Sequence, residues 1–213
     1  MKQITMILFL VFISCKQGKK YHETSDNQMV FISNSITEIL EHRKKINEDF
    51  QNPEISPLPD RYRKDFDALD FFEPDTNYIV LAHFKRTPDA LPFMMSTTTD
   101  EINEEVVYAV VSFELNGKTH QLEVYQNSEL KTQEKYKDYL FLPFLDNTNG
   151  EETYGGGRYI DLKIPEGDSI LIDFNKAYNP YCVYNKKYSC PLVPRQNHLK
   201  TRVLAGVKDF IKK

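Results

Sequence analysis

The sequence predicts an α+β domain, mainly antiparallel β, in which a sandwich or barrel-like sheet carries an N-terminal amphipathic helix. One early segment has helical periodicity, and from residue 77 onward apolar residues alternate with a period of two. The expected strands are short, closely spaced and separated by turn residues, which is typical of antiparallel sheets. Strands do not alternate with helices along the sequence and no internal repeat is present, so a parallel α/β fold is not expected.

The first 14 residues have the pattern of a secretory signal peptide. Lys2 supplies a positive charge, residues 4–13 form an apolar run, and Ser14 is a small residue before Cys15. The run is shorter than the roughly 20 apolar residues that span a bilayer. A cleaved leader is therefore expected rather than a membrane-spanning helix.

The stretch 12–15, Phe-Ile-Ser-Cys, resembles a relaxed bacterial lipobox. It predicts cleavage before Cys15 and a lipid anchor on this cysteine, which makes a membrane a partner of the protein. The expected location is the cell envelope, on the periplasmic face or outer surface of a bacterial membrane. An ordinary signal peptide beside an incidental cysteine is the alternative.

The remaining chain divides into a polar tether and one domain. Residues 15–30 are mostly polar and are expected to form the tether, and residues 31–213 are expected to form a single globular domain. Without the leader and its one lysine, 26 basic residues stand against 31 acidic ones, a net charge of −5. This acidic balance gives no basic surface for nucleic acid, so that class of partner is not expected.

The expected helix covers residues 35–50. Ser35 and Glu38 have the spacing of a capping box, and apolar residues then recur along one helical face up to Phe50. Four prolines in residues 53–75 predict an irregular segment, with a short helix possible at 60–68.

The sheet is expected to consist of short strands. Asn116-Gly117 separates two of them and is the dipeptide favoured in a type I′ hairpin turn. The expected strands are 78–85, 106–115, 118–126, 139–145, 159–164, 169–174 and 199–207.

A glycine triplet, residues 155–157, precedes Arg158. No Lys-Ser or Lys-Thr follows it and the next segment is an expected strand, so a turn or bulge is favoured over a phosphate-binding loop. Arg158 is expected either to bind a carboxylate or phosphate of a ligand or to pair with Asp161 or Asp173.

The loop 173–199 is the segment most suggestive of function. An irregular stretch of this length is usually functional or covalently fixed, and this one is rich in Tyr, Asn and Pro. Its tyrosines are expected to line a cleft, or else to order the loop by packing against one another. These tyrosines are Tyr178, Tyr181, Tyr184 and Tyr188. The candidate ligand-binding residues are Arg158, Asp173, Asn175, Tyr178, Asn179, Arg195 and Asn197.

Two cysteines, Cys182 and Cys190, lie within this loop. In an exported protein, with Cys15 assigned to lipid, they predict a disulfide that braces the loop. Two buried thiols are the alternative. A thiol nucleophile acting with His198 and Asp173 is an enzymatic hypothesis. No metal site is expected because the spacing of these cysteines and His198 matches no usual zinc pattern, and no cofactor is predicted.

Paired carboxylates are a second enzymatic hypothesis. Two acids about 5–9 Å apart are the arrangement used in glycoside hydrolysis, although surface charge is the simpler interpretation. The acids concerned are Glu151, Glu152, Asp161, Asp168 and Asp173.

Several blocks, in order, resemble domain-of-unknown-function family 1684. They are 142–150, 153–154, 156–162, 173–175, 177–180 with Cys182, 188–192, Pro194, Asn197, Leu199, 205–206 and Lys208. The resemblance covers roughly residues 57–208. It implies no activity, substrate or cofactor, but it places both cysteines in the shared pattern with Arg158, Asp173, Asn175 and Asn179. Gln196 and Val207 stand where Glu is more often expected.

Three functions follow from these observations. The preferred one is binding of a small polar ligand or cell-envelope partner at the loop 173–199, with Arg158 and Asp173 fixing polar groups. The second is a hydrolase that uses a cysteine or carboxylate in the same region. The third is a structural envelope protein without a ligand site.

Overall fold

The structure is a computed structural model that describes residues 21–210, with side chains described from residue 33 onward. The expected signal peptide and the lipid anchor at Cys15 lie outside the described residues. Within residues 21–210, no helix is both long enough and apolar enough to cross a membrane.

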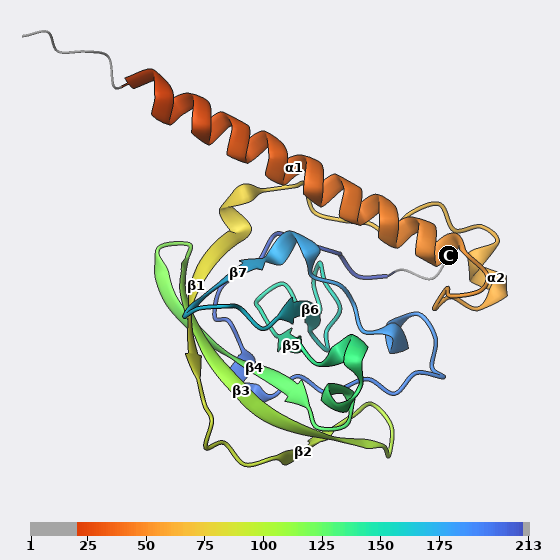
Figure 1. Ribbon diagram of the computed structural model, residues 1–213. Coiled ribbons are helices and arrows are strands. Elements are labelled where there is room, and N and C mark those ends of the chain that lie inside the picture. The colour runs from red at the N-terminus through yellow and green to blue at the C-terminus, as the bar shows by residue number, and fades with distance from the viewer. Residues whose placement is uncertain (1–20, 211–213) are drawn as a thin grey trace, which may run out of the picture.

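A single antiparallel sheet of seven strands forms the body of the domain (Figure 1). The strands are β1 Ile79–Arg86, β2 Phe93–Ser96, β3 Ile102–Leu115, β4 Lys118–Asn127, β5 Tyr139–Phe144, β6 Arg158–Lys163 and β7 Ser169–Asp173. Their order is β6-β5-β4-β3-β1-β7, and β2 pairs with the start of β3. The sheet curves into a half-barrel, and a bulge in β3 between Val107 and Ala109 adds to its bend. The expected class, mainly antiparallel α+β with an N-terminal helix, is confirmed.

The β3–β4 hairpin turns at Asn116-Gly117, as the sequence predicts. Asn116 has a φ of 52° and Gly117 a φ of 70°, the left-handed conformation that a type I′ turn needs at both positions. The turn pairs Leu115 with Lys118, so the apolar residues of both strands fall on one face.

The prediction of a strand at 199–207 is wrong. The segment forms one isolated bridge, Val207 with Phe71, rather than a ladder. Its carbonyls are bound by a side chain, because Arg158 donates to the oxygens of Val203, Ala205 and Val207. The short strand β2, by contrast, was not predicted, because Phe-Met-Met-Ser does not alternate.

Helix α1, Tyr21–Gln51, begins well before the expected start at Ser35. Ser35 and Glu38 therefore lie inside the helix and do not form a capping box. Residues 21–30, expected as tether, are part of α1; neither proline nor glycine interrupts residues 21–51. The helix ends two residues before Pro53, as expected. Helix α2 is shorter than expected and covers only Asp60–Arg63.

The main core lies on one face of the half-barrel. It contains Val80, Ala82, Phe84, Val111, Phe113, Leu122, Val124, Leu140, Leu142, Ile160 and Ile172. Strand β5 is buried on both faces except for its half-buried first residue, and β6 is buried on both faces from Arg158 to Ile160, whereas Asp161 and Lys163 are exposed. Their second face is covered by the loop 173–199 and the C-terminal half of α1, where Phe50 packs edge-on against Tyr184 with ring centroids 4.8 Å apart.

Candidate functional site

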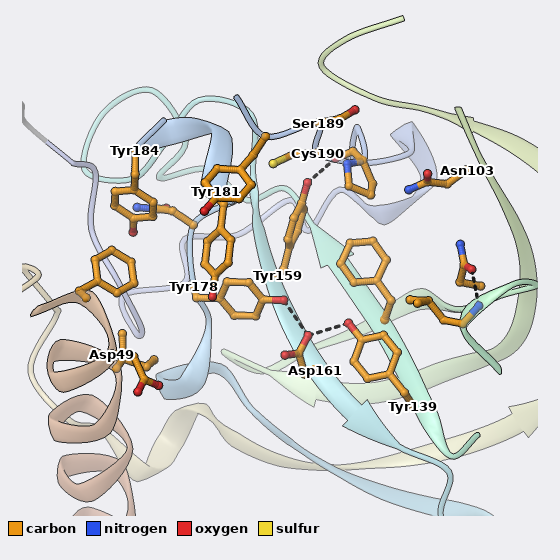
Figure 2. A pocket seen from close by; sticks show the side chains of 18 of the residues that line it. Asp49, Asn103, Tyr139, Tyr159, Asp161, Tyr178, Tyr181, Tyr184, Ser189 and Cys190 are labelled. Atoms are coloured by element: carbon orange, nitrogen blue, oxygen red, sulfur yellow. Dashed lines mark hydrogen bonds between the residues drawn. The ribbon is translucent and has the colours of Figure 1, made fainter. Parts of the chain in front are cut away.

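A cavity of about 450 Å³ lies on the second face of β5 and β6. Its other walls are the C-terminal half of α1, the ends of β3 and β4, and residues 178–191 of the loop (Figure 2). This volume falls within the range of roughly 300–1,000 Å³ that is typical of ligand pockets. Eight aromatic side chains line it: Phe50, Tyr139, Phe141, Tyr159, Tyr178, Tyr181, Tyr184 and Tyr188.

The alternation of side chains along β5 and β6 determines which residues form the floor of the cavity. Successive side chains of a strand point to opposite faces, so Tyr139 and Phe141 of β5 share a face, as do Tyr159 and Asp161 of β6. Phe141 and Asp161 are direct cross-strand partners. The rings of Phe141 and Tyr159 pack edge-on at 4.7 Å. The floor is thus an aromatic surface with one carboxylate in it.

Asp161 is held by two tyrosine hydroxyls (Figure 2). Tyr139 donates to Asp161 Oδ1 at 2.8 Å and Tyr178 donates to the same atom at 2.7 Å. Burial, followed by the charge of Asp161, raises the pKa of both tyrosines, so they remain protonated donors. Asp161 is exposed, and within residues 21–210 no donor reaches its Oδ2. The carboxylate is therefore fixed in place with one oxygen free.

Glu105 is a second carboxyl group in the lining. It is 3% exposed, and Asn127 donates to its Oε1 at 2.8 Å. Its Oε2 is buried without a hydrogen-bond partner among the described residues. Burial raises the pKa of Glu105, against the opposing effect of the Asn127 hydrogen bond. A buried oxygen left without a partner is unusual in a folded protein and points to a group that the chain itself does not supply.

The loop is attached to β6 beside Asp161. Tyr159 and Tyr178 exchange backbone hydrogen bonds of 2.9 and 3.0 Å, and the Tyr159 hydroxyl donates to the Pro191 carbonyl. The rings of Tyr181 and Tyr188 pack together at 5.3 Å. All four loop tyrosines line the cavity, so the loop both packs its own rings and forms a cleft.

Cys182 and Cys190 are free thiols, so the structure does not contain the expected disulfide. The two residues are close, because the Cys182 amide donates to Cys190 Sγ at 3.1 Å. The hydrogen bond with the Cys190 thiol lowers the pKa of Cys182, whereas that same bond and burial raise the pKa of Cys190. Cys190 lines the cavity, whereas His198 is exposed and neither it nor Asp173 does. The expected thiol, imidazole and carboxylate are therefore not assembled in the cavity.

Arg158 faces the other side of β6 and does not line the cavity. Its side chain is fully buried and pairs with Asp146 at 2.8 Å, rather than with Asp161 or Asp173. It also donates to carbonyls of the C-terminal segment, including Val203 at 3.0 Å. The expected ligand-binding arginine is thus a structural one, because strand alternation directs it into the core.

Of the other candidates, only Tyr178 and Asn179 line the cavity. Asp173 and Asn175 form a local turn, in which the Asp173 carboxylate accepts from the Asn175 amide at 3.0 Å. Asn197 is buried and donates to the Pro143 carbonyl at 2.8 Å. Arg195 is exposed in the short 3-10 helix Arg195–Asn197 and lies outside the lining.

The acids singled out as a possible pair are not brought together. Glu151 and Glu152 both bind Arg202 at the surface, and Asp168 lies in the exposed turn before β7. Only Asp161 belongs to the cavity lining. Over the described part of the chain, no group of three or more His, Cys, Asp or Glu residues could hold a metal ion.

Glu105, Tyr139 and Tyr159 were not among the candidate residues that the sequence indicated. The run of apolar and aromatic residues on both faces of 139–144 was a usable signal, because a strand buried on two faces must be covered by another layer. Glu105 gave no such signal, since exposed glutamates at strand ends are common.

The family model of DUF1684, described as a protein of unknown function, matches residues 64–208. The chain belongs to the DUF1684 family. The match includes every cavity residue except those of α1. A similar structure is the solution NMR structure of the uncharacterized protein from gene locus rrnAC0354 of Haloarcula marismortui, with 32% identity and a TM-score of 0.61. The alignment covers 87% of this chain and 96% of that one. No curated protein matches the chain.

Proposed function

We propose that this DUF1684 protein is an exported, lipid-anchored binding protein that holds a small polar ligand in the cavity beneath the loop 173–199. The supporting observation is the combination of an aromatic cavity of about 450 Å³ with a buried, unpartnered oxygen of Glu105 in its lining. A ligand that donates to this oxygen would remove the cost of leaving it unpaired, which is roughly 1–3 kcal/mol for a buried polar group.

The proposed location rests on the sequence pattern around Cys15. Metabolic labelling with a radioactive or alkyne-bearing fatty acid tests it, with membrane fractionation as a second measurement. The wild-type chain is expected to take up label and to sediment with membranes, whereas Cys15→Ala should do neither. Equal labelling of both chains would contradict the anchor.

Binding is tested by screening a small-fragment library against the ¹⁵N-labelled protein. Fragments that bind are expected to shift the amide resonances of lining residues such as Tyr178 and Asn179. Two neighbouring residues of β3 supply a matched pair of variants, because Asn103 lines the cavity and Glu104 faces outward. Asn103→Trp should abolish the shifts by filling the cavity, and Glu104→Trp should leave them unchanged.

Two results would reject a binding role. One is the absence of any fragment whose shifts map to the cavity, and the other is equal binding by the two tryptophan variants. Turnover of an ester, amide or glycoside fragment would instead identify a hydrolase at this site.

A further inference from the structure

We infer that the ligand of this cavity is a protonated amine with an apolar or aromatic body. The inference rests on the proposed binding function and adds the chemical class of the ligand.

The charge of the lining favours a cation. Three carboxyl-bearing residues contribute to it, Asp49, Glu105 and Asp161, and no lysine or arginine of residues 33–210 does. His42 also lines the cavity, but burial and the nearby Lys176 lower its pKa, so it adds little positive charge at neutral pH. Asp49 already forms an ion pair with Lys45, but Glu105 and Asp161 have no basic partner among the described residues, so an anionic ligand would meet uncompensated acidic groups.

The hydrogen-bonding groups of the lining favour a donor. Glu105 Oε2 and Asn179 Oδ1 are both buried acceptors without partners among the described residues, and their residues are 3% and 1% exposed. At Asp161 the hydroxyl protons of Tyr139 and Tyr178 are already used on Oδ1, so Oδ2 is available as an acceptor. A ligand that carries several N–H groups satisfies such acceptors, whereas a carboxylate or a phosphate does not.

The aromatic rings of the lining also favour a cationic ligand. Aromatic faces attract a cation within about 6 Å. Carboxylates beside the rings add a direct electrostatic attraction for the same cation. Tyr139 and Tyr178 are fixed around Asp161 by their hydrogen bonds, so their rings are held in place before a ligand arrives (Figure 2). The unpaired acceptors require a hydrogen-bond donor, which a protonated amine has and a quaternary ammonium lacks.

The test is a calorimetric titration of the full chain with four probes that share a phenylethyl body. They are 2-phenylethylammonium, its N,N,N-trimethyl derivative, the neutral 2-phenylethanol and the anionic 3-phenylpropanoate. The primary ammonium is expected to bind at least about tenfold more tightly than any other probe, which is the scale of one charge-assisted hydrogen bond.

The outcomes separate this inference from the proposed function. Equal or tighter binding of the alcohol or the anion would overturn the inference but leave a binding protein. Equal binding of the trimethyl derivative would overturn the assignment of an N–H donor. Absence of binding by all four probes would overturn the amine inference, and the function would then depend on the independent fragment screen.

Matched variants locate the interaction. Asp161→Asn and Glu105→Gln remove charge from the cavity with little change in shape, and each should reduce the preference for the ammonium over the alcohol by about tenfold. Glu123→Gln is the control, because Glu123 also accepts from a tyrosine hydroxyl, that of Tyr125 at 2.7 Å, but lies outside the lining. A preference that survives both cavity variants, or that falls equally in Glu123→Gln, would contradict the inference.

Discussion

The two faces of strand β6 use charged residues in opposite ways. On the core face, Arg158 and Asp146 are both fully buried, and Arg158 also binds carbonyls of residues 203–207. On the cavity face, three residues further along, Asp161 is exposed and keeps one oxygen free of protein donors in the described part of the chain. The hydrogen bonds of the first arrangement stabilise the fold, whereas the free carboxylate oxygen of the second is available to another molecule.

This contrast separates structural from recognition roles by where the two buried carboxylates find their hydrogen-bond donors rather than by charge. The Asp146 carboxylate accepts from Arg158, from the amide and hydroxyl of Thr148, and from the amide of Val203. Glu105, on the cavity side, has one donor and one buried oxygen without a partner in the described chain. The satisfied Asp146 carboxylate stabilises the fold, although Arg158 Nε beside it is also buried without a partner in the described chain. Glu105 differs in that it lines a cavity, where a ligand can supply the missing donor.

The largest effect on stability is expected from Arg158→Ala. It leaves the buried Asp146 carboxylate unpaired and frees the carbonyls of residues 203–207, so the free energy of unfolding should fall by about 3–5 kcal/mol. Urea denaturation measures this. Arg202→Ala is the control: it removes only exposed pairs with Glu151 and Glu152, so the free energy of unfolding should change far less than in Arg158→Ala. Similar losses of unfolding free energy in the two variants would contradict the distinction between the two faces of β6.

The next effect is a pH dependence that arises from Glu105. Burial raises its folded-state pKa above the ordinary value of 4.5, so between those two pKa values the folded state binds more protons than the unfolded state. This carboxyl therefore lowers stability as pH rises from about 4.5 through the folded pKa. Glu105→Gln should become progressively more stable relative to wild type over that window, as measured by urea unfolding at several pH values. A constant difference between the two curves would show that the carboxyl is not buried as described.

A smaller effect is expected from Tyr178→Phe. It removes one of two hydroxyl donors to an exposed carboxylate, so unfolding should change by no more than about 1 kcal/mol. Asp161 should nevertheless become less well fixed, and the affinity for 2-phenylethylammonium should fall several-fold. Tyr136→Phe is a control, because Tyr136 does not line the cavity. A Tyr178→Phe variant that loses stability without losing affinity would make this hydroxyl structural.

The smallest expected effect is a difference in reactivity between the two thiols, which tests how the loop is arranged. Cys182 is half-buried and its pKa is lowered, whereas Cys190 is buried and its pKa is raised. Iodoacetamide should therefore modify Cys182 faster than Cys190, as followed by mass spectrometry of peptides without prior reduction. Complete protection of both, reversed by a reductant, would show instead the disulfide that the sequence predicts.

Much of the sheet was predictable because its determinants are local. The Asn116-Gly117 turn and the alternation along 79–86 and 118–127 placed three neighbouring strands from short-range patterns alone. The segment 199–207 was not predictable in this way. Its carbonyls are held by Arg158 from a distant part of the chain rather than by a strand partner, and its sequence does not record that contact.

The site was predictable in part for the same reason. The tyrosines of the loop were expected to line a cleft and do so, because a cluster of aromatic residues in a long loop must pack on something. Arg158 and Asp161 were not distinguished, since charge alone does not say which face of a strand is the core. Glu105 was missed because its burial depends on residues that are distant in sequence, such as Asn127 of β4, which donates to its carboxyl group.

The structure of the protein with bound 2-phenylethylammonium tests the central claim most directly. We expect the ammonium nitrogen within hydrogen-bond distance of the Asp161 or Glu105 carboxylate, with the ring among the tyrosines that line the cavity. A probe bound elsewhere on the surface, or a cavity without the probe at saturating concentration, would contradict the account of this face of β6 as a recognition surface.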